Sequence, residues 1–291
     1  MSQRHGLDFL KHIKEQIISA YHNSIASMKI PHKILALLLM ILTGCSSVPT
    51  AQSVATPTKG GITYENTVVS LTFDDGDADN YSVRSILAEN NLHATFYIVS
   101  GFTNTSGYMT SDQLRGLFSD GNEIGGHTFS HTKLTKENDD NLIKREICQD
   151  RSNLLAYGFE VTSFAYPYGY YDERAKQVVR DCGYNNARIV SDGPDIIPPG
   201  DAYALQAMPY IVSDTKFAKM SRYVKEVENG GGGWAIFIFH HVCGGCDKYA
   251  IDIDTFTKFA EWIGSQQVNN GLIIKTVGEV VGGEVKPAVD P

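Results

Sequence analysis

Two adjacent carboxylates that follow a short apolar run are the clearest sign of chemistry in this sequence. Residues 68–73 are mainly β-branched, aliphatic or aromatic, which favours a buried strand, and Asp74 and Asp75 end that run before a glycine. Because successive side chains of a strand point to opposite faces, the two carboxylates face different directions. One of them can bind a metal ion while the other stays free as a general base. A lone Asp-Asp-Gly sequence is more often an ordinary turn before a helix, so the interpretation needs further site residues.

Two histidines four residues apart supply further metal ligands. His127 and His131 follow a predicted strand at residues 123–126. On one turn of helix they share a face and can bind the same ion. A single carboxylate from another strand completes three ligands and leaves positions open for water and substrate. We therefore predict that Asp75, His127 and His131 hold a divalent cation, with Asp74 beside it as the base.

A third candidate segment, residues 163–169, reads Ser-Phe-Ala-Tyr-Pro-Tyr-Gly. Pro167 has no amide to donate and Gly169 lets the chain turn, which leaves the amide of Tyr168 available near a strand end. A free backbone donor beside a metal can stabilise a tetrahedral oxyanion. The alternative is an ordinary turn with incidental tyrosines. The side chains that could line a sugar-binding cleft here are Tyr166, Tyr168, Tyr170 and Tyr171.

The apolar run at residues 234–242 ends in His240 and His241. A histidine at the end of a core strand can serve as a general acid, although it can also simply bond a loop carbonyl. Because side chains alternate along a strand, only one of these two histidines is expected to face the site.

Strand-like and helix-like segments alternate from residue 64 onward, which predicts parallel strands joined by crossover helices. The candidate residues follow strands, at the face where barrel enzymes place their sites. We therefore predict a single α/β domain, a distorted (β/α) barrel of seven or eight units. The predicted strands are residues 68–73, 94–99, 123–126, 162–166, 186–190, 204–212, 235–239 and 272–277. The predicted helices are residues 81–89, 111–119, 138–157, 173–181, 216–228 and 255–266, the second with a capping box of Thr110 and Gln113.

Four motifs in this order resemble the polysaccharide deacetylase family, carbohydrate esterase family four, with its chitooligosaccharide deacetylase homology domain. They are TFDDG, HTFSH, AYPYG and IFIFHH, and the match spans about residues 67–280, which is most of the mature chain. The resemblance implies a distorted (β/α) barrel that removes acetyl groups from an acetylated polysaccharide with a divalent metal, usually Zn²⁺. It makes Asp74 the catalytic base, and Asp75, His127 and His131 the metal ligands. The Tyr168 amide then holds the oxyanion and His240 protonates the leaving group.

The sequence departs from the pattern of the family at two places. Ala165 stands where many relatives have an arginine that steadies the catalytic aspartate, and Arg188, at the end of the next predicted strand, is our candidate for that task. The family's aspartate that tunes the acidic histidine is not evident. The candidates for it are Asp192, Asp195 and Asp214.

The N-terminal region predicts export. Lys29 and Lys33 precede a nine-residue apolar run at 34–42, too short to span a bilayer, and Cys45 follows in the sequence Leu-Thr-Gly-Cys. This resembles a bacterial lipoprotein signal, against the alternative of a buried helix and an ordinary cysteine. We predict a signal peptide at residues 1–44, in which residues 1–27 are an upstream artefact of start-codon choice, because Met28 stands where such a signal normally begins. A lipidated Cys45 and flexible tether follow at 45–63, and the catalytic domain at 64–291.

Sorting, charge and the other cysteines agree with an exported enzyme. Ser46 rather than aspartate follows Cys45, which favours the outer membrane and periplasm of a Gram-negative host, or otherwise the outer face of the cell membrane. The 25 basic and 33 acidic residues give a net charge of −8, which disfavours a nucleic-acid partner. Of three possible disulfide pairings we favour Cys148–Cys182 with Cys243–Cys246, although the second pair could be redox-active or half of a zinc knuckle.

We therefore expect a metal-dependent hydrolase that removes acetyl groups from an N-acetylated, N-acetylglucosamine-containing polysaccharide at the cell envelope. The alternatives are an acetylxylan or other O-acetyl esterase, a glycan-binding pseudoenzyme and, more distantly, a thiol oxidoreductase. The sequence identifies neither the polymer nor the oligomeric state.

Overall fold

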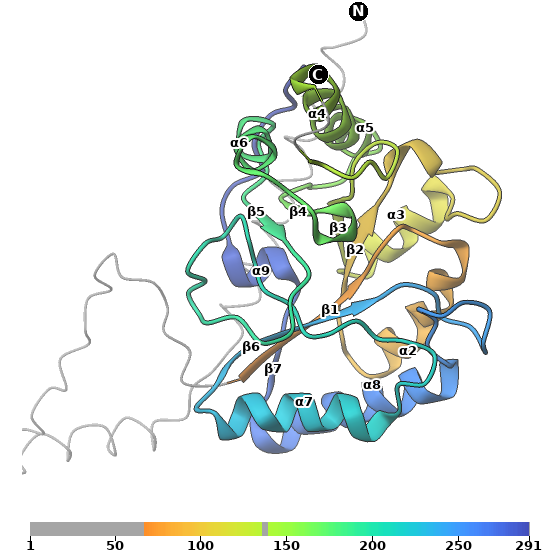
Figure 1. The fold of residues 1–291 in the computed structure, drawn as a ribbon. Coiled ribbons are helices and arrows are strands. Elements are labelled where there is room, and N and C mark those ends of the chain that lie inside the picture. The colour runs from red at the N-terminus through yellow and green to blue at the C-terminus, as the bar shows by residue number, and fades with distance from the viewer. Residues whose placement is uncertain (1–66, 136–138, 291) are drawn as a thin grey trace, which may run out of the picture. The chain divides into compact units, whose positions relative to one another are not determined.

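The run that precedes the two carboxylates forms strand β1 (Thr67–Phe73), an inner strand of a parallel sheet. The computed structural model describes residues 67–135 and 139–290, so the predicted signal peptide, Cys45 and the whole predicted tether lie outside the described residues. The sheet has the order β5-β4-β3-β2-β1-β6, with β7 paired to β1 (Figure 1). The other strands are β2 (Thr95–Ile98), β3 (Glu123–Gly126), β4 (Ser163–Ala165), β5 (Asn186–Arg188), β6 (Gly233–Phe239) and β7 (Ile273–Ile274).

Strand β1 pairs with three neighbours. It runs beside β6 over its whole length, from Thr67 opposite Gly233 to Phe73 opposite Phe239. On its other edge, β7 pairs with the first part of β1 and β2 with its last two residues. All these pairs are parallel, so the strands end at the same edge of the sheet. The predicted α/β barrel class is thereby confirmed, as a curled parallel sheet surrounded by helices.

The strand predicted at residues 204–212 is wrong, because no regular strand forms there. The segment nevertheless bridges β5 and β6. The Leu205 amide donates to the Ala187 carbonyl at 2.9 Å, and the Met208 amide donates to the Ile236 carbonyl at 2.8 Å. Pro209 has no amide to continue a ladder in the middle of the segment. The gap between the two strands is therefore bridged by irregular backbone.

Helices follow most strands, largely at the predicted positions. They are η1 (Ala78–Ser82), α2 (Val83–Glu89), η2 (Ser100–Phe102), α3 (Ser111–Ser119), α4 (Asp140–Lys144), η3 (Arg145–Gln149), α5 (Asp150–Ala156), η4 (Pro167–Gly169), α6 (Glu173–Asp181), α7 (Phe217–Asn229), α8 (Ile253–Asn270) and α9 (Val277–Val281). The capping box of Thr110 and Gln113 on α3 is confirmed. The strand predicted at 272–277 ends early, because Thr276 and Glu279 form a capping box that starts α9.

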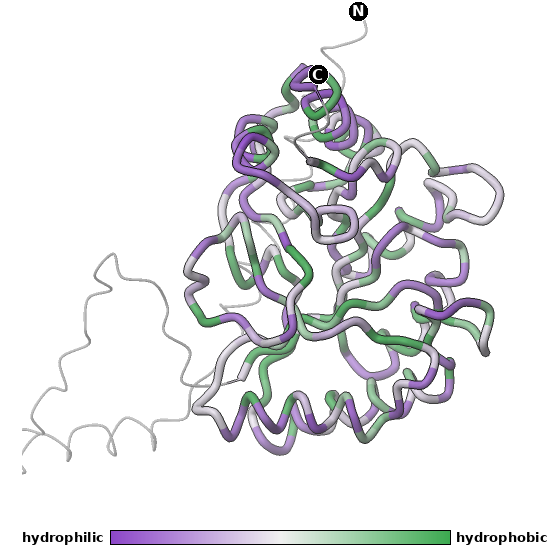
Figure 2. Tube along the Cα trace, in the orientation of Figure 1, coloured by the Kyte–Doolittle hydropathy of each residue, from purple (hydrophilic) through white to green (hydrophobic). Residues whose placement is uncertain are grey.

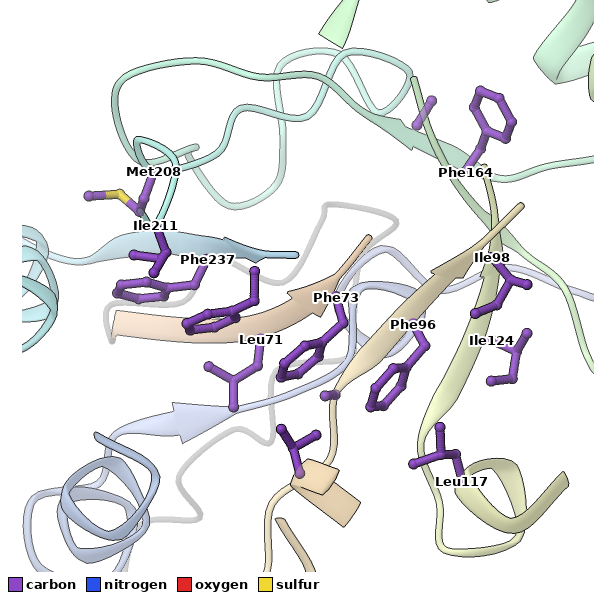
Figure 3. Close-up of a cluster of buried hydrophobic side chains, with 14 of the residues drawn as sticks. Leu71, Phe73, Phe96, Ile98, Leu117, Ile124, Phe164, Met208, Ile211 and Phe237 are labelled. Carbon is purple, nitrogen blue, oxygen red and sulfur yellow. The ribbon is translucent and has the colours of Figure 1, made fainter. Parts of the chain in front are cut away.

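A layer of aromatic side chains joins the sheet to its helices. The ring of Phe73 lies 4.9 Å from that of Phe96, 5.2 Å from that of Phe239 and 5.6 Å from that of Phe256 on α8. Figure 3 shows Phe73 and Phe96 in this layer, and Figure 2 shows hydrophobic residues along the central strands and hydrophilic ones on outer helices such as α7. Burial on this scale stabilises the strands whose ends carry the candidate site.

Both favoured disulfides are confirmed. Cys148 in η3 bonds Cys182 at the end of α6, with their Cα atoms 5.0 Å apart, and Cys243 bonds Cys246 in the loop after β6. Within residues 67–135 and 139–290, no helix has both the length and the apolar character needed to cross a membrane.

Candidate metal centre and active site

The three predicted metal ligands meet at the carboxyl ends of β1 and β3. Asp75 Oδ1 lies 3.1 Å from His131 Nε2 and 3.4 Å from His127 Nε2. Burial raises the pKa of Asp75, but the two imidazoles lower it by more, so that the net effect holds it well below its ordinary value. One carboxylate and two imidazole nitrogens thus converge on one point, as a divalent cation requires.

The orientation of His127 is set by a backbone carbonyl. Its Nδ1 lies 2.8 Å from the carbonyl oxygen of Ala165, and the side chain is almost fully buried. A carbonyl can only accept, so Nδ1 must carry the proton. The Nε2 lone pair is then left to face Asp75, the arrangement that orients most metal-binding histidines.

The prediction that both histidines lie on one helical turn is wrong. Residues 127–131 form a loop, with Thr128 at φ 67° and His131 at φ 57°. Glu146, which is almost fully buried, holds this loop: its two carboxylate oxygens accept from the amide and the hydroxyl of Ser130, each at 2.8 Å. The predicted helix at residues 138–157 did not indicate this role, because a glutamate on a helix is usually solvated.

A second buried carboxylate fixes the start of the same loop. Asp150 accepts from the amides of His127 and Ser100, each at 3.0 Å, and from the Tyr184 hydroxyl at 3.2 Å. Burial raises the pKa of Asp150 to about 7. Gly126 is required beside it, since a Cβ at that position would collide with the Tyr184 hydroxyl.

Asp74 is buried against Arg188, which lies at the end of β5. The Arg188 Nη2 donates to both carboxylate oxygens, at 2.7 and 2.5 Å, and its guanidinium lies 5.2 Å from the centroid of the Tyr97 ring. Ala165, where the arginine of many relatives is missing, pairs directly with Arg188 across the β4–β5 ladder. An arginine one strand further along the sheet therefore reaches the aspartate.

The segment after β4 forms a tight turn with Tyr168 in the left-handed region, at φ 60°. The turn's own hydrogen bonds run from the Gly169 amide to the Tyr166 carbonyl and from the Tyr170 amide to the Pro167 carbonyl. The Tyr168 amide takes part in neither bond. Its ring packs 4.6 Å from that of His131, at the edge of the metal centre.

The four tyrosines of this segment divide between two environments. Tyr166 and Tyr168 line the cavity above the metal ligands. Tyr171 instead stacks on Tyr166, with ring centroids 4.8 Å apart, and Tyr170 is exposed beneath Lys133, whose Nζ lies 3.7 Å from the ring centroid.

Of the two histidines after β6, His240 faces the cavity and His241 turns away. His241 Nδ1 lies 2.9 Å from Asp79 Oδ2, whereas the His240 ring packs beside the rings of Tyr210 and Tyr249, at centroid distances of 5.5 and 5.4 Å. Burial lowers the pKa of His240, an effect that the nearby Asp74 partly opposes.

The carboxylate partner sought for His240 is not found among the described residues. Its Nδ1 is buried without a hydrogen-bond partner there. Asp195 instead accepts from the amides of Ile196 and Gln206, and neither Asp192 nor Asp214 bonds the ring. The histidine is thus packed against two aromatic rings rather than paired with an acid.

These residues surround one cavity of about 130 Å³. Its lining is Asp74, Asp75, His127, His131, Tyr166, Tyr168, Val190, Tyr210, His240 and Tyr249. The sequence analysis did not identify Val190, Tyr210 or Tyr249, which stand in irregular segments without motif spacing. Cys243 and Cys246 lie near Asp79, but their disulfide removes the thiolates that a zinc knuckle would need.

Comparison with known proteins supports the resemblance given by the motifs. The family model described as polysaccharide deacetylase matches residues 61–187. A peptidoglycan-N-acetylglucosamine deacetylase of Bacillus cereus is 25% identical over 131 residues, which cover 43% of this chain and 59% of that protein. A chitin deacetylase of Arthroderma benhamiae is 27% identical over 123 residues, covering 41% and 33%. The chain therefore spans less than two thirds of either relative.

Solved structures show the same fold. A family 4 carbohydrate esterase from Streptomyces lividans, in complex with acetate, superimposes with a TM-score of 0.54 at 17% identity, covering 76% of this chain and 98% of that one. A domain of a multidomain xylanase from the hindgut metagenome of Trinervitermes trinervoides gives 0.51 at 19% identity, covering 76% and 96%.

The Asp74–Arg188 pair generates a first prediction. Arg188→Gln leaves a buried carboxylate without its cation, and we expect a loss of about 3–5 kcal/mol in the free energy of unfolding. Urea denaturation measures this loss. The double variant Asp74→Asn/Arg188→Gln removes both charges and should recover most of it. A double variant that is as unstable as Arg188→Gln would contradict the pairing.

Glu146 generates a second prediction. Glu146→Ala leaves the Ser130 amide without its acceptor and frees the loop that carries His131, so Zn²⁺ affinity should fall about 10- to 100-fold. Competition titration with a chromophoric chelator measures the affinity. Glu160→Ala, at an exposed position, is the matched control and should bind Zn²⁺ like the wild type. Unchanged affinity in Glu146→Ala would refute the anchoring role.

Proposed function

We propose that this chain, a member of the polysaccharide deacetylase family over residues 61–187, is a metal-dependent hydrolase that removes acetyl groups from an N-acetylated polysaccharide. The observation that carries the proposal is the meeting of Asp75, His127 and His131 beside the buried Asp74–Arg188 pair. The names of the relatives, which act on peptidoglycan N-acetylglucosamine and on chitin, favour an N-acetylglucosamine-containing polymer.

The residues present fit a divalent cation. Asp75 Oδ1 is buried, accepts no hydrogen bond within the described part of the chain, and faces two imidazole nitrogens. A set of two nitrogen ligands and one oxygen ligand with room for others suits Zn²⁺. When bound, the cation would polarise the acetyl carbonyl and lower the pKa of a coordinated water from 15.7 towards about 7.

The chain's own residues can carry the proton transfers. Asp74, held by Arg188, takes a proton from the attacking water. The Tyr168 amide donates to the oxyanion, a contact whose loss in other enzymes costs about 2.7–4 kcal/mol. His240 then gives a proton to the departing amine, and acetate leaves.

The alternative functions differ from this proposal either in the leaving group of the reaction or in having no catalytic turnover. An acetylxylan or other O-acetyl esterase could use the same residues, since an alcohol also leaves with one proton. The case for a glycan-binding pseudoenzyme depended on the missing arginine at Ala165. It is weakened because Arg188 reaches Asp74 instead.

Substitution of the base and of a ligand tests the proposal. Asp74→Asn should lower the rate of acetate release about 10²- to 10⁴-fold while Zn²⁺ content stays near one per chain. His131→Ala should lose both Zn²⁺ and activity. Acetate assay and elemental analysis give the two readouts, with Glu261→Gln on the exposed face of α8 as the control acid.

The substrates in that assay separate the alternatives. Faster release from N-acetylglucosamine oligomers than from acetylxylan is expected, and the reverse preference would support the esterase. A Zn²⁺-loaded wild type that binds these glycans but releases no acetate from any of them would support the pseudoenzyme.

We also propose that the protein is an exported lipoprotein attached to the cell envelope through Cys45. The apolar run at 34–42, the two preceding lysines and the Leu-Thr-Gly-Cys sequence support this proposal. Cys45→Ala should abolish incorporation of labelled palmitate and leave the chain out of the mature, membrane-bound fraction. Equal labelling and fractionation of Cys45→Ala and wild type would refute it.

A further inference from the structure

The loop at residues 242–251, which follows β6, carries two features that the proposed reaction does not use. These are the disulfide between Cys243 and Cys246 and the ring of Tyr249, which lines the cavity. The loop is closed at its base by backbone bonds, from the Cys243 amide to the Ile251 carbonyl at 2.9 Å and from the Ile251 amide to the His241 carbonyl at 2.8 Å.

Between these ends the loop has little packing of its own. Residues 244–248 are all exposed. One backbone bond, from the Ser213 amide to the Lys248 carbonyl at 3.0 Å, joins this part to a neighbouring segment. Segments with few buried contacts are the ones that open locally at low free-energy cost. The disulfide, which brings the Cα atoms of its two cysteines to 5.9 Å, therefore restricts a segment that packing alone holds weakly.

This weakly packed loop places one aromatic ring, that of Tyr249, in the lining of the cavity. The Tyr249 ring lies 5.4 Å from the ring of His240 and 5.5 Å from that of Tyr210. The backbone amide of Tyr249 donates to Asp247 Oδ1 at 2.7 Å. Tyr249 lines the cavity together with His240, against whose ring its own ring packs. Aromatic walls of this kind pack on the apolar faces of ligands, and a sugar ring presents such a face.

We propose that Tyr249 contacts the sugar on the leaving-group side of the acetyl group, and that the Cys243–Cys246 disulfide positions Tyr249 for this contact. The proposal rests on the proposed function of the same cavity. Tyr249 is thus a binding residue, and the two cysteines are positioning residues that act through it.

The metal ligands and the base do not depend on this loop. Asp74 and Asp75 follow β1, and the histidine loop is held by Glu146 and Asp150. His240 keeps its contact with Tyr210, and Asn80 donates to its carbonyl oxygen. Opening the disulfide should therefore weaken substrate binding while Zn²⁺ content and the chemical step are retained.

Kinetics of three variants on an N-acetylglucosamine oligomer test the proposal. Cys243→Ser/Cys246→Ser and Tyr249→Ala should each raise KM about tenfold, which corresponds to about 1.4 kcal/mol, with kcat within about twofold of wild type and Zn²⁺ content unchanged. Tyr249→Phe keeps the ring and should resemble the wild type.

Combining the changes shows whether the disulfide acts through Tyr249. In the Tyr249→Ala background, replacing both cysteines should add no further increase in KM. Additive increases, or a fall in kcat at constant KM, would overturn the positioning role. Should the cysteine variant fail to fold, titration of wild type and Tyr249→Ala with a non-chelating phosphine reductant makes the same comparison, because Cys148 and Cys182 are buried and Cys246 is exposed.

Binding to an inactive variant separates this proposal from the proposed function. Calorimetric titration of Asp74→Asn with the oligomer reports affinity without turnover. A tenfold weaker affinity on adding Tyr249→Ala supports the sugar contact even if the wild type proves inactive. Equal affinity with and without Tyr249→Ala refutes the contact, whatever the wild type hydrolyses.

Discussion

The contact between Asp74 and Arg188 constrains the whole sheet. Asp74 follows β1 and Arg188 ends β5, four positions apart in the strand order. In a flat sheet, strands so placed would stand about 19 Å apart, since neighbours are separated by about 4.8 Å. The observed 2.5–2.7 Å contacts therefore require a sheet curled enough to bring these two strand ends face to face. The same curl forms the cavity, because the side chains at those strand ends must then point towards a common centre.

Curling also lets two neighbouring carboxylates have different surroundings. Asp74 continues the strand, donating its amide to the Phe239 carbonyl at 2.9 Å, and its side chain meets a guanidinium. Asp75 adopts φ 69°, which turns its side chain towards two imidazoles instead. The left-handed backbone at Asp75 thus separates the proposed base from the proposed ligand. Two adjacent aspartates can act as base and as metal ligand only if they have different partners, because their side chains are chemically identical.

The sequence predicted what depends on local pattern. Apolar runs located β1 and β6, and the motifs placed Asp75, His127 and His131 at strand ends. The sequence analysis failed where the backbone conformation depends on contacts between residues that are far apart in the sequence. The bridge at residues 204–212 takes its partners from two different strands, and the left-handed residues of the histidine loop are stabilised by Glu146, which belongs to a later helix. Tyr249 reaches the cavity through a loop whose path no periodicity encodes.

The helical run that supplies Glu146 shows how the histidine loop is held from outside the sheet. Glu146 and Asp150 are four residues apart and therefore share a face, and both point their carboxylates at that loop. Cys148, between them, bonds Cys182 at the end of α6. Two buried carboxylates would favour solvation over burial if the run could move away, since each costs free energy to desolvate. The disulfide opposes that movement. The covalent link thus ties the run that holds the histidine loop to the end of α6, although it touches none of the proposed metal ligands.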